Sequence, residues 1–199
     1  PAGGEGGRTW RKLGLEGESD FHLLGSSFGT NAVYVFNHTP NSRMSKPGIH
    51  STIDDGFSWK HAEGKGLDGA ALNLAVHPSN NRIVAAGTKT GLFLSTDGGD
   101  RFKRLASGEQ ILAAFFDVDE KQLWFSSYGG KPALTRLDWN SGKKAVIDLP
   151  PLTEDAVAYI AQNPVNRNEY AVATFGRSVY QSKDQGKTWA QIADRGQTQ

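Results

Sequence analysis

A short motif recurs along the chain, and this repetition constrains the fold more than any other feature of the sequence. Its clearest copies are TIDDGFSW (52–59), STDGGDRF (95–102) and SKDQGKTW (182–189). Each copy begins with Ser or Thr, has Asp at its third position and Gly at its fifth, and ends in Trp or Phe. The three aspartates are separated by 43 and 87 residues. Because the second interval is about twice the first, a further copy is expected within it.

The expected copy falls at DWNSGKKA (138–145), where Asn140 and Gly142 take the Asp and Gly positions. A weaker copy, GGEGGRTW (3–10), has Glu5 in the Asp position. Motifs at this spacing indicate a modular architecture, in which one supersecondary unit is repeated along the chain.

Each repeat reads as four short strands joined by turns that contain Asn, Gly or Pro. The strand segments of the second repeat are ALNLAVHP (71–78), RIVAAGT (82–88), GLFLSTD (91–97) and RFKRLA (101–106). Such units are typical of β-propeller blades, and no segment has a sustained helical period. The sequence therefore predicts an all-β propeller of four full four-stranded antiparallel blades, preceded by one extra N-terminal strand. The expected repeats of this single domain are 1–15 (partial), 16–63, 64–106, 107–149 and 150–194.

The extra strand, TWRKLGL (9–15), is not preceded by the three strands that would complete its blade. An isolated outer strand makes no blade, because a sheet needs its inner strands to bury its faces. We therefore expect the chain to be an arc of a larger propeller of six or seven blades, either open or closed by another chain.

Composition excludes several classes of function. Lys and Arg number 22 against 21 Asp and Glu, so the net charge of +1 gives no electrostatic reason to expect a nucleic acid. No apolar run approaches the roughly 18 residues of a membrane span. The chain has no cysteine, which excludes disulfides and thiolate metal sites. The histidines form no metal-spaced pair, and no cofactor is expected.

The repeated motif resembles the Asp-box, or bacterial neuraminidase repeat, of sialidases, sortilin-type receptors and a photosystem II assembly factor. The stretches KLGLEGESDFHLL, AVHPSNNRIVAAGTKTGLFLS and LTEDAVAYIAQNP further resemble secreted bacterial propellers that carry an automatic glycosyl-hydrolase label. This resemblance implies an extracytoplasmic bacterial protein, either secreted or a lipoprotein. It also implies that the boxes lie on the face opposite the ligand-binding face.

The boxes are predicted to be structural. An Asp in the turn between the third and fourth strands can accept hydrogen bonds from backbone N–H groups, and the Gly supplies a positive φ. The terminal aromatic ring would cover the hairpin with apolar surface. The predicted box residues are Asp54, Gly56, Trp59, Asp97, Gly99, Phe102, Asn140, Gly142, Asp184, Gly186 and Trp189.

The connections at the opposite ends of the strands form the candidate ligand-binding surface. Because successive strands alternate in direction, the loops that enter each first strand lie beside those between the second and third strands. The entering loops carry the acids Glu18, Asp20, Asp68, Glu109, Glu154 and Asp155. These acids could form a ring that binds a cation, contacts sugar hydroxyls or supplies a carboxylate pair for glycoside cleavage, or they could only cap local turns. The candidates for catalysis are Asp20, Asp68, Glu109 and Asp155.

The loops between the second and third strands add basic and aromatic candidates. These are Arg43, Lys89, Tyr128, Lys131 and Arg177. The first of these loops, 37–48, is the longest, and long loops often carry recognition. Tyr128 could stack on a sugar ring, whereas the cations could be solvated only. His22, beside Asp20, completes the predicted ligand-binding set.

Two functions fit this surface. One is a non-catalytic propeller that binds a glycan or protein ligand, and the other is a glycoside hydrolase. The Phe-Arg-Ile-Pro signature of sialidases is absent, and only two arginines fall in the favoured loops, which disfavours sialic acid relative to a neutral polysaccharide. A neutral-glycan hydrolase needs only two carboxylates, about 5–5.5 Å or 6.5–9.5 Å apart. Propellers host both activities, so the fold alone cannot decide between the two functions. We expect binding without catalysis and keep the hydrolase as the alternative.

Overall fold

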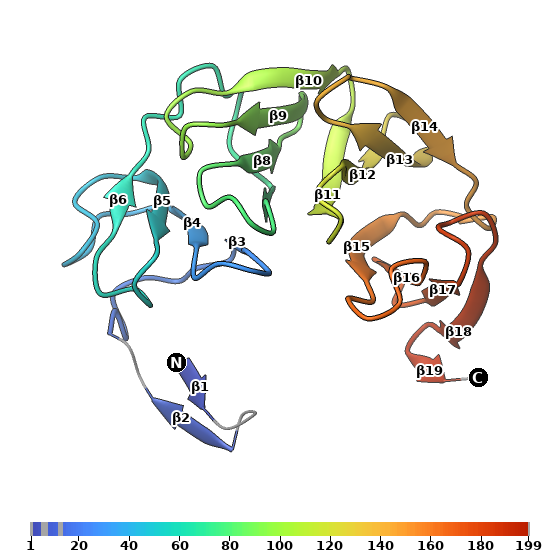
Figure 1. The fold of residues 1–199 in the computed structure, drawn as a ribbon, viewed down its shortest axis with the longest axis horizontal. Coiled ribbons are helices and arrows are strands. Elements are labelled where there is room, and N and C mark those ends of the chain that lie inside the picture. The colour runs from blue at the N-terminus through green and yellow to red at the C-terminus, as the bar shows by residue number, and fades with distance from the viewer. Residues whose placement is uncertain (1, 5–7, 12–13, 199) are drawn as a thin grey trace.

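The computed structural model describes residues 2–4, 8–11 and 14–198, and every regular element in this part of the chain is a β-strand. The strands form four antiparallel sheets that follow one another around an arc, with a separate two-stranded hairpin at the N-terminal end (Figure 1). The protein is therefore an all-β partial propeller, as the repeats predict.

Each sheet is built from strands that are consecutive in the chain. The first sheet contains β3 (Leu24–Ser26), β4 (Val33–Asn37), β5 (Gly48–Thr52) and β6 (Lys60–His61). The second contains β7 (Asn73–Val76), β8 (Val84–Gly87), β9 (Gly91–Ser95) and β10 (Lys103–Ser107). The third contains β11 (Gln110–Phe116), β12 (Gln122–Tyr128), β13 (Pro132–Asp138) and β14 (Lys144–Ile147). The fourth contains β15 (Val157–Gln162), β16 (Tyr170–Thr174), β17 (Val179–Ser182), β18 (Ala190–Asp194) and β19 (Gln197–Thr198).

The first strands of the sheets line the inside of the arc. Strand β7 contacts both β3 and β11, and β11 also contacts β15 (Figure 1). This order brings the entering loops of all four sheets to the same side of the molecule.

Apolar side chains fill each junction between neighbouring sheets. In the second sheet, Phe93 packs toward the first sheet, whereas its neighbours Leu92 and Leu94 pack toward the third. Because successive side chains on a strand point to opposite faces, a sheet that packs between two others must be apolar on both of its faces. This requirement explains the continuous apolar run of β9, which is buried along its whole length.

The outer face of the first sheet is covered by its own chain. Val35 and His50 face away from the second sheet, yet they are only 1% and 2% exposed. Met44 of the 38–47 loop is 1% exposed, and Arg43 beside it donates hydrogen bonds to the carbonyls of Gly56 and Phe57. We attribute the burial to this loop, which Met44 anchors. Met44 thus anchors the long loop, whereas most of its other residues are exposed.

Two elements at the ends differ from the prediction. The predicted lone strand has a partner, because β2 (Thr9–Arg11) pairs with β1 (Ala2–Gly4). The fourth sheet gains a fifth strand, since Arg195 and Gly196 adopt φ values of 47° and 88° and turn β18 back into β19. Two consecutive positive φ values are typical of a tight hairpin turn. Glu5 of the weakest motif copy lies outside the described residues.

Candidate functional site

Two edges of the sheets must be distinguished. The loop edge consists of the segments that enter the first strands (15–23, 62–72, 108–109 and 148–156) and those between second and third strands (38–47, 88–90, 129–131 and 175–178). The turn edge consists of the connections at the opposite ends of the same strands. All predicted ligand-binding residues belong to loop-edge segments or to the strand ends that adjoin them.

The predicted acids at the loop edge mostly bind their own sheet. Glu18 accepts hydrogen bonds from the N–H and hydroxyl groups of Ser42, at 2.8 and 2.9 Å, and these bonds lower its pKa. Asp68 pairs with Arg104 at 2.7 Å, and the hydrogen bonds from Arg104 and Thr90 lower the pKa of its carboxyl. These acids therefore tie an entering loop to a neighbouring segment of the sheet.

The third and fourth sheets repeat this arrangement with different partners. The hydroxyl of Ser127 donates to Glu109. Asp155 accepts hydrogen bonds from the N–H groups of Ala156 and Gly176, each at 2.8 Å. Burial opposes ionisation of Asp155, but its hydrogen bonds outweigh that effect and lower its pKa. The interpretation that these acids cap local turns therefore accounts for their contacts.

The other predicted residues are exposed to solvent. Asp20 forms an ion pair with His22 at 2.9 Å, with both side chains at least 75% exposed. Tyr128 is 48% exposed. Lys89, Lys131, Glu154 and Arg177 are likewise exposed. Arg43, predicted to project from the loop edge, instead reaches the turn at 56–57, because its loop folds across the first sheet.

A groove of about 400 Å³ lies where the inner strands meet the loop edge. It is lined by residues from all four sheets, including His22 from the predicted set. Its apolar lining residues Leu24, Tyr159 and Phe175 are 57%, 73% and 62% exposed. An open concavity with apolar walls and a polar rim is the usual form of a ligand site. Sequence reasoning missed Tyr159 and Phe175, because aromatic residues in strands ordinarily indicate a core.

The turn edge is organised around a hydroxyl group in three sheets. In the second sheet, the hydroxyl of Ser95 donates to Asp97 and accepts from the N–H of Gly99, each at 2.8 Å. Asp97 also accepts from the N–H of Arg101 at 2.9 Å, which is the largest cause of its lowered pKa. Gly99 has a φ of 92°, and a Cβ there would lie 2.9 Å from Ala62.

The first and fourth sheets use the same geometry. Asp54 accepts from the hydroxyl and N–H groups of Ser58, and Asp184 accepts from those of Thr188. Hydrogen bonds from these two residues are the main cause of pKa values of about 2 for both aspartates. Thr52 and Ser182 supply the central hydroxyls. Their Gly partners and terminal aromatics are Gly56, Gly186, Trp59 and Trp189, and Phe102 ends the second copy.

The third sheet departs from the predicted motif. Its turn spans residues 139–143, two residues fewer than the turns at 53–59, 96–102 and 183–189. Asp138, not Asn140, is the acceptor, with bonds from the N–H groups of Asn140 and Ser141 at 3.1 and 2.9 Å. The assignment of Asn140 to the Asp role was therefore wrong, because the shorter turn places the carboxylate two residues earlier. Gly142 keeps its predicted positive φ, at 78°.

No group of three or more His, Asp or Glu side chains in residues 2–4, 8–11 and 14–198 lies close enough to hold a metal ion. The same part of the chain contains no helix that could cross a membrane.

Comparison with solved structures supports the fold. No family model and no curated protein matches the sequence. The chain is similar to a GH74 enzyme from Niastella koreensis, with a TM-score of 0.62 and 17% identity over 85% of this chain and 29% of that one. It is similar to an ancestral GH74 enzyme, with a TM-score of 0.66 and 19% identity over 88% of this chain and 24% of the enzyme.

A third similar structure is not described as an enzyme. A chain of a nidogen–laminin complex matches with a TM-score of 0.68 and 10% identity, over 90% of this chain and 66% of that one. The chain covers 29% of the length of the Niastella koreensis enzyme and 24% of the length of the ancestral enzyme, so it spans only part of each. At these identities the similarities concern the fold, and they agree with a β-propeller.

Proposed function

We propose that this chain belongs to an extracytoplasmic Asp-box β-propeller that binds a glycan or protein ligand at its loop edge without catalysis. The groove lined by all four inner strands is the observation that carries the proposal. Tyr159 and Phe175 offer exposed rings within it, and rings of this kind combine a large apolar surface with low conformational freedom. The lining residue His22, and Tyr128 paired with the lining residue Gln110 on the neighbouring strand, would orient the ligand.

Two of the four catalytic candidates, Asp68 and Asp155, are poorly suited to the role of general acid. A general acid for glycoside cleavage needs a raised pKa so that it remains protonated near neutral pH. The pKa shifts of Glu18, Asp68 and Asp155 are all downward, because each carboxylate accepts hydrogen bonds that favour its charge. A hydrolase acting on a neutral polysaccharide remains the alternative, since GH74 enzymes share this fold.

An array of neutral and acidic glycans and of extracellular matrix proteins, probed with the purified chain, tests both functions. We expect retention without hydrolysis products, and loss of retention in Tyr128→Ala and Phe175→Ala. Phe57→Ala is the matched control, because Phe57 is 61% exposed but lies at the turn edge. Product formation that disappears in Asp68→Asn or Asp155→Asn would favour the hydrolase. Equal loss in the Phe57 control would contradict the placement of the site.

A further inference from the structure

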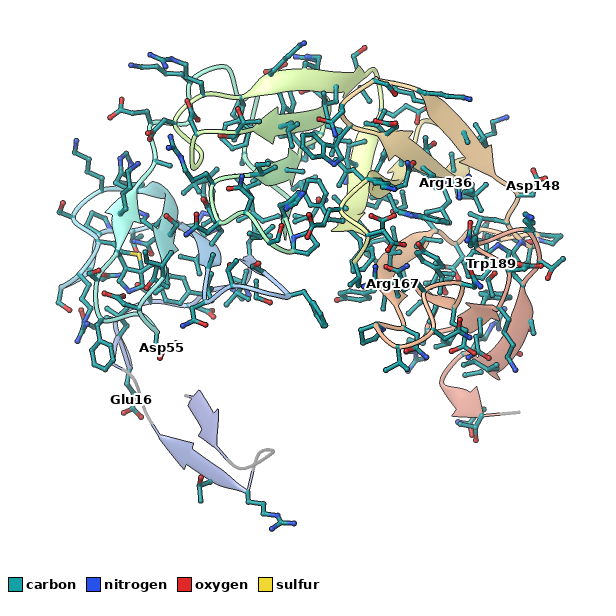
Figure 2. The ribbon with its side chains drawn as sticks, viewed as in Figure 1. Glu16, Asp55, Arg136, Asp148, Arg167 and Trp189 are labelled. Carbon is teal, nitrogen blue, oxygen red and sulfur yellow. The ribbon has the colours of Figure 1, made fainter. Side chains whose placement is uncertain are left out.

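A polar cleft of about 620 Å³ lies at the turn edge, between the third and fourth sheets. Its walls come from the first turn of the third sheet, the shortened turn at 139–143, and the first turn and box of the fourth sheet. Figure 2 labels Arg136 of the third sheet and Arg167 of the fourth, which lie on opposite sides of this junction. The cleft is separate from the groove at the loop edge.

The shortened turn of the third sheet forms one wall of the cleft. In the other three sheets the connection between third and fourth strands ends in a large ring, Trp59, Phe102 or Trp189. In the third sheet the chain has already entered β14 after five residues, and Ala145 lines the cleft. Phe102 and Trp189 pack at the junction with the preceding sheet, so the ring that the third sheet lacks would face the second sheet and not this cleft.

Arg136 lies on the face of the third sheet that packs against the fourth sheet. Trp124 and Leu134 of the same face are buried in the core that the third and fourth sheets share. The strand register places Arg136 between Trp124 and Ala145, and its guanidinium lies 5.7 Å from the centre of the Trp124 ring. A charge in such a row costs desolvation free energy unless it is paired.

Arg136 has no such partner in the part of the chain that the structure describes. Among the residues that the structure describes, none accepts a hydrogen bond from its guanidinium, and none forms an ion pair with it within 4.0 Å. A guanidinium offers five donors in a planar fork, which matches the oxygens of a carboxylate, sulfate or phosphate group.

The carboxylates of the cleft are already engaged. Asp119 pairs with Arg167. Asp138 accepts from two backbone N–H groups of its turn. Asp117 accepts from the N–H groups of Lys121 and Gln122, at 3.1 Å each, and burial raises its pKa although Arg136 has a smaller opposing effect.

Basic groups therefore remain in excess. Besides Arg136, the exposed side chains of Lys121, Lys143 and Lys144 line the cleft. Asp138 interacts electrostatically with Lys143, which leaves Lys121 and Lys144 beside Arg136. A half-buried arginine with unused donors, flanked by two lysines in an open cleft, is an arrangement that attracts an anion.

We propose that this cleft is a second binding site, which takes an oxyanion group with Arg136 as its central donor and Lys121 and Lys144 at its mouth. Planar carboxylates and tetrahedral sulfate or phosphate groups share this chemistry, and the experiment separates these sources. The site is independent of the function proposed for the loop edge, because it lies at the other ends of the strands.

The test is a titration of the isotopically labelled chain with inorganic sulfate, inorganic phosphate and trigalacturonic acid, followed by backbone amide chemical shifts. We expect saturable shifts confined to 117–122, 136–145 and 167–170 with at least one probe. Arg136→Gln should weaken this binding about tenfold or more, because a charged hydrogen-bonding group is lost. Arg136→Lys keeps the charge but not the fork, and should bind with intermediate affinity.

Arg101→Gln provides the matched control, since Arg101 lies at the turn edge in a smaller cleft of about 300 Å³. It should bind the probe as the parent chain does. Shifts that do not saturate, or that spread over all surface lysines, would mean an adventitious ion only and would overturn the proposal. Unchanged affinity in Arg136→Gln would also overturn it. If that variant failed to fold, the location of the shifts in the parent chain and the affinity of Arg136→Lys would still decide.

Discussion

The two edges of the same four sheets use their acids in different ways. At the turn edge, Asp54, Asp97 and Asp184 make the same bonds around a buried hydroxyl in three sheets. At the loop edge the acids bind a different partner in each sheet. For example, Glu18 accepts hydrogen bonds from Ser42, and Asp155 accepts one from the backbone N–H of Gly176. Repetition at one edge reflects the common demand of closing a hairpin. Variation at the other is expected where loops are free to carry recognition.

The first prediction tests the turn edge at one of its buried hydroxyl groups. The Ser95 side chain is 1% exposed and links Gly99 to Asp97. Ser95→Ala leaves the N–H of Gly99 without its acceptor, and should lower the free energy of unfolding by about 1–3 kcal/mol. Urea unfolding followed by tryptophan fluorescence measures the loss. Thr96→Val, at the exposed neighbouring position, is the control. A loss no larger than in this control would show that the hydroxyl does not organise the turn.

This comparison also shows what could be read from the sequence. The strands of the second sheet were predictable, because Gly91 and the Asp97 turn bound an apolar run that is buried on both faces. The acceptor in the third sheet was not predictable from spacing. Asp138 and Asn140 both stand at positions that could accept turn N–H bonds, and only the length of the hairpin decides between them.

The candidate site was harder to predict than the fold. Loop acids were identifiable as a set, but their partners Ser42, Ser127 and Gly176 lie 18 to 24 residues away, and no local pattern links them. Phe175 could not be recognised as exposed, because exposure depends on how the four inner strands surround the groove. The chemical character of the loop residues could therefore be predicted from the sequence. Which of them pack within a sheet and which face the solvent became clear only from the structure.

The second prediction concerns the loop edge, where the effect on stability should be smaller. Asp155→Ala removes the acceptor of the Ala156 and Gly176 N–H groups and should cost about 1 kcal/mol, because the Gly176 group can turn to water. Asp155→Asn keeps one oxygen and should cost less. Urea unfolding of both variants ranks them. Equal losses would indicate that the charge of Asp155, not its hydrogen bonds, stabilises the loop.

The third prediction concerns how the stability of the fold declines at acidic pH. Asp54 and Asp184 have pKa values of about 2, below their ordinary value of 3.8, so their ionised forms stabilise the fold. This contribution is fully present above pH 4 and is lost as the pH falls toward about 2. The double variant Asp54→Asn, Asp184→Asn should therefore show a flatter decline of stability over this range. Urea midpoints measured from about pH 5 to 2.5 test it.

Asp55→Asn is the matched control for the acid titration. Asp55 is an exposed carboxylate in the same turn, and its φ of 58° is one that asparagine tolerates. This variant should follow the parent chain across the whole range. A decline as steep in the double variant as in the parent would assign acid sensitivity to other carboxylates.

The smallest effect is expected in the third turn. The Asn140 side chain is exposed, and its own backbone N–H is held by Asp138. Asn140→Ala should change the free energy of unfolding by no more than about 0.5 kcal/mol. Asp138→Ala, which removes the acceptor of two N–H groups, should be the more destabilising of the pair. The reverse order in thermal or urea unfolding would restore Asn140 to the role that the motif suggested.

The central claim is that stability is held at the turn edge and ligand binding at the loop edge. Melting temperature and ligand retention, measured together on Asp184→Ala and Phe175→Ala, test it most directly. Asp184→Ala should lower the melting temperature by a few degrees and leave retention by the folded protein unchanged. Phe175→Ala should abolish retention at an unchanged melting temperature, because its ring is 62% exposed. Loss of retention in Asp184→Ala at an unchanged melting temperature would contradict the division between the two edges.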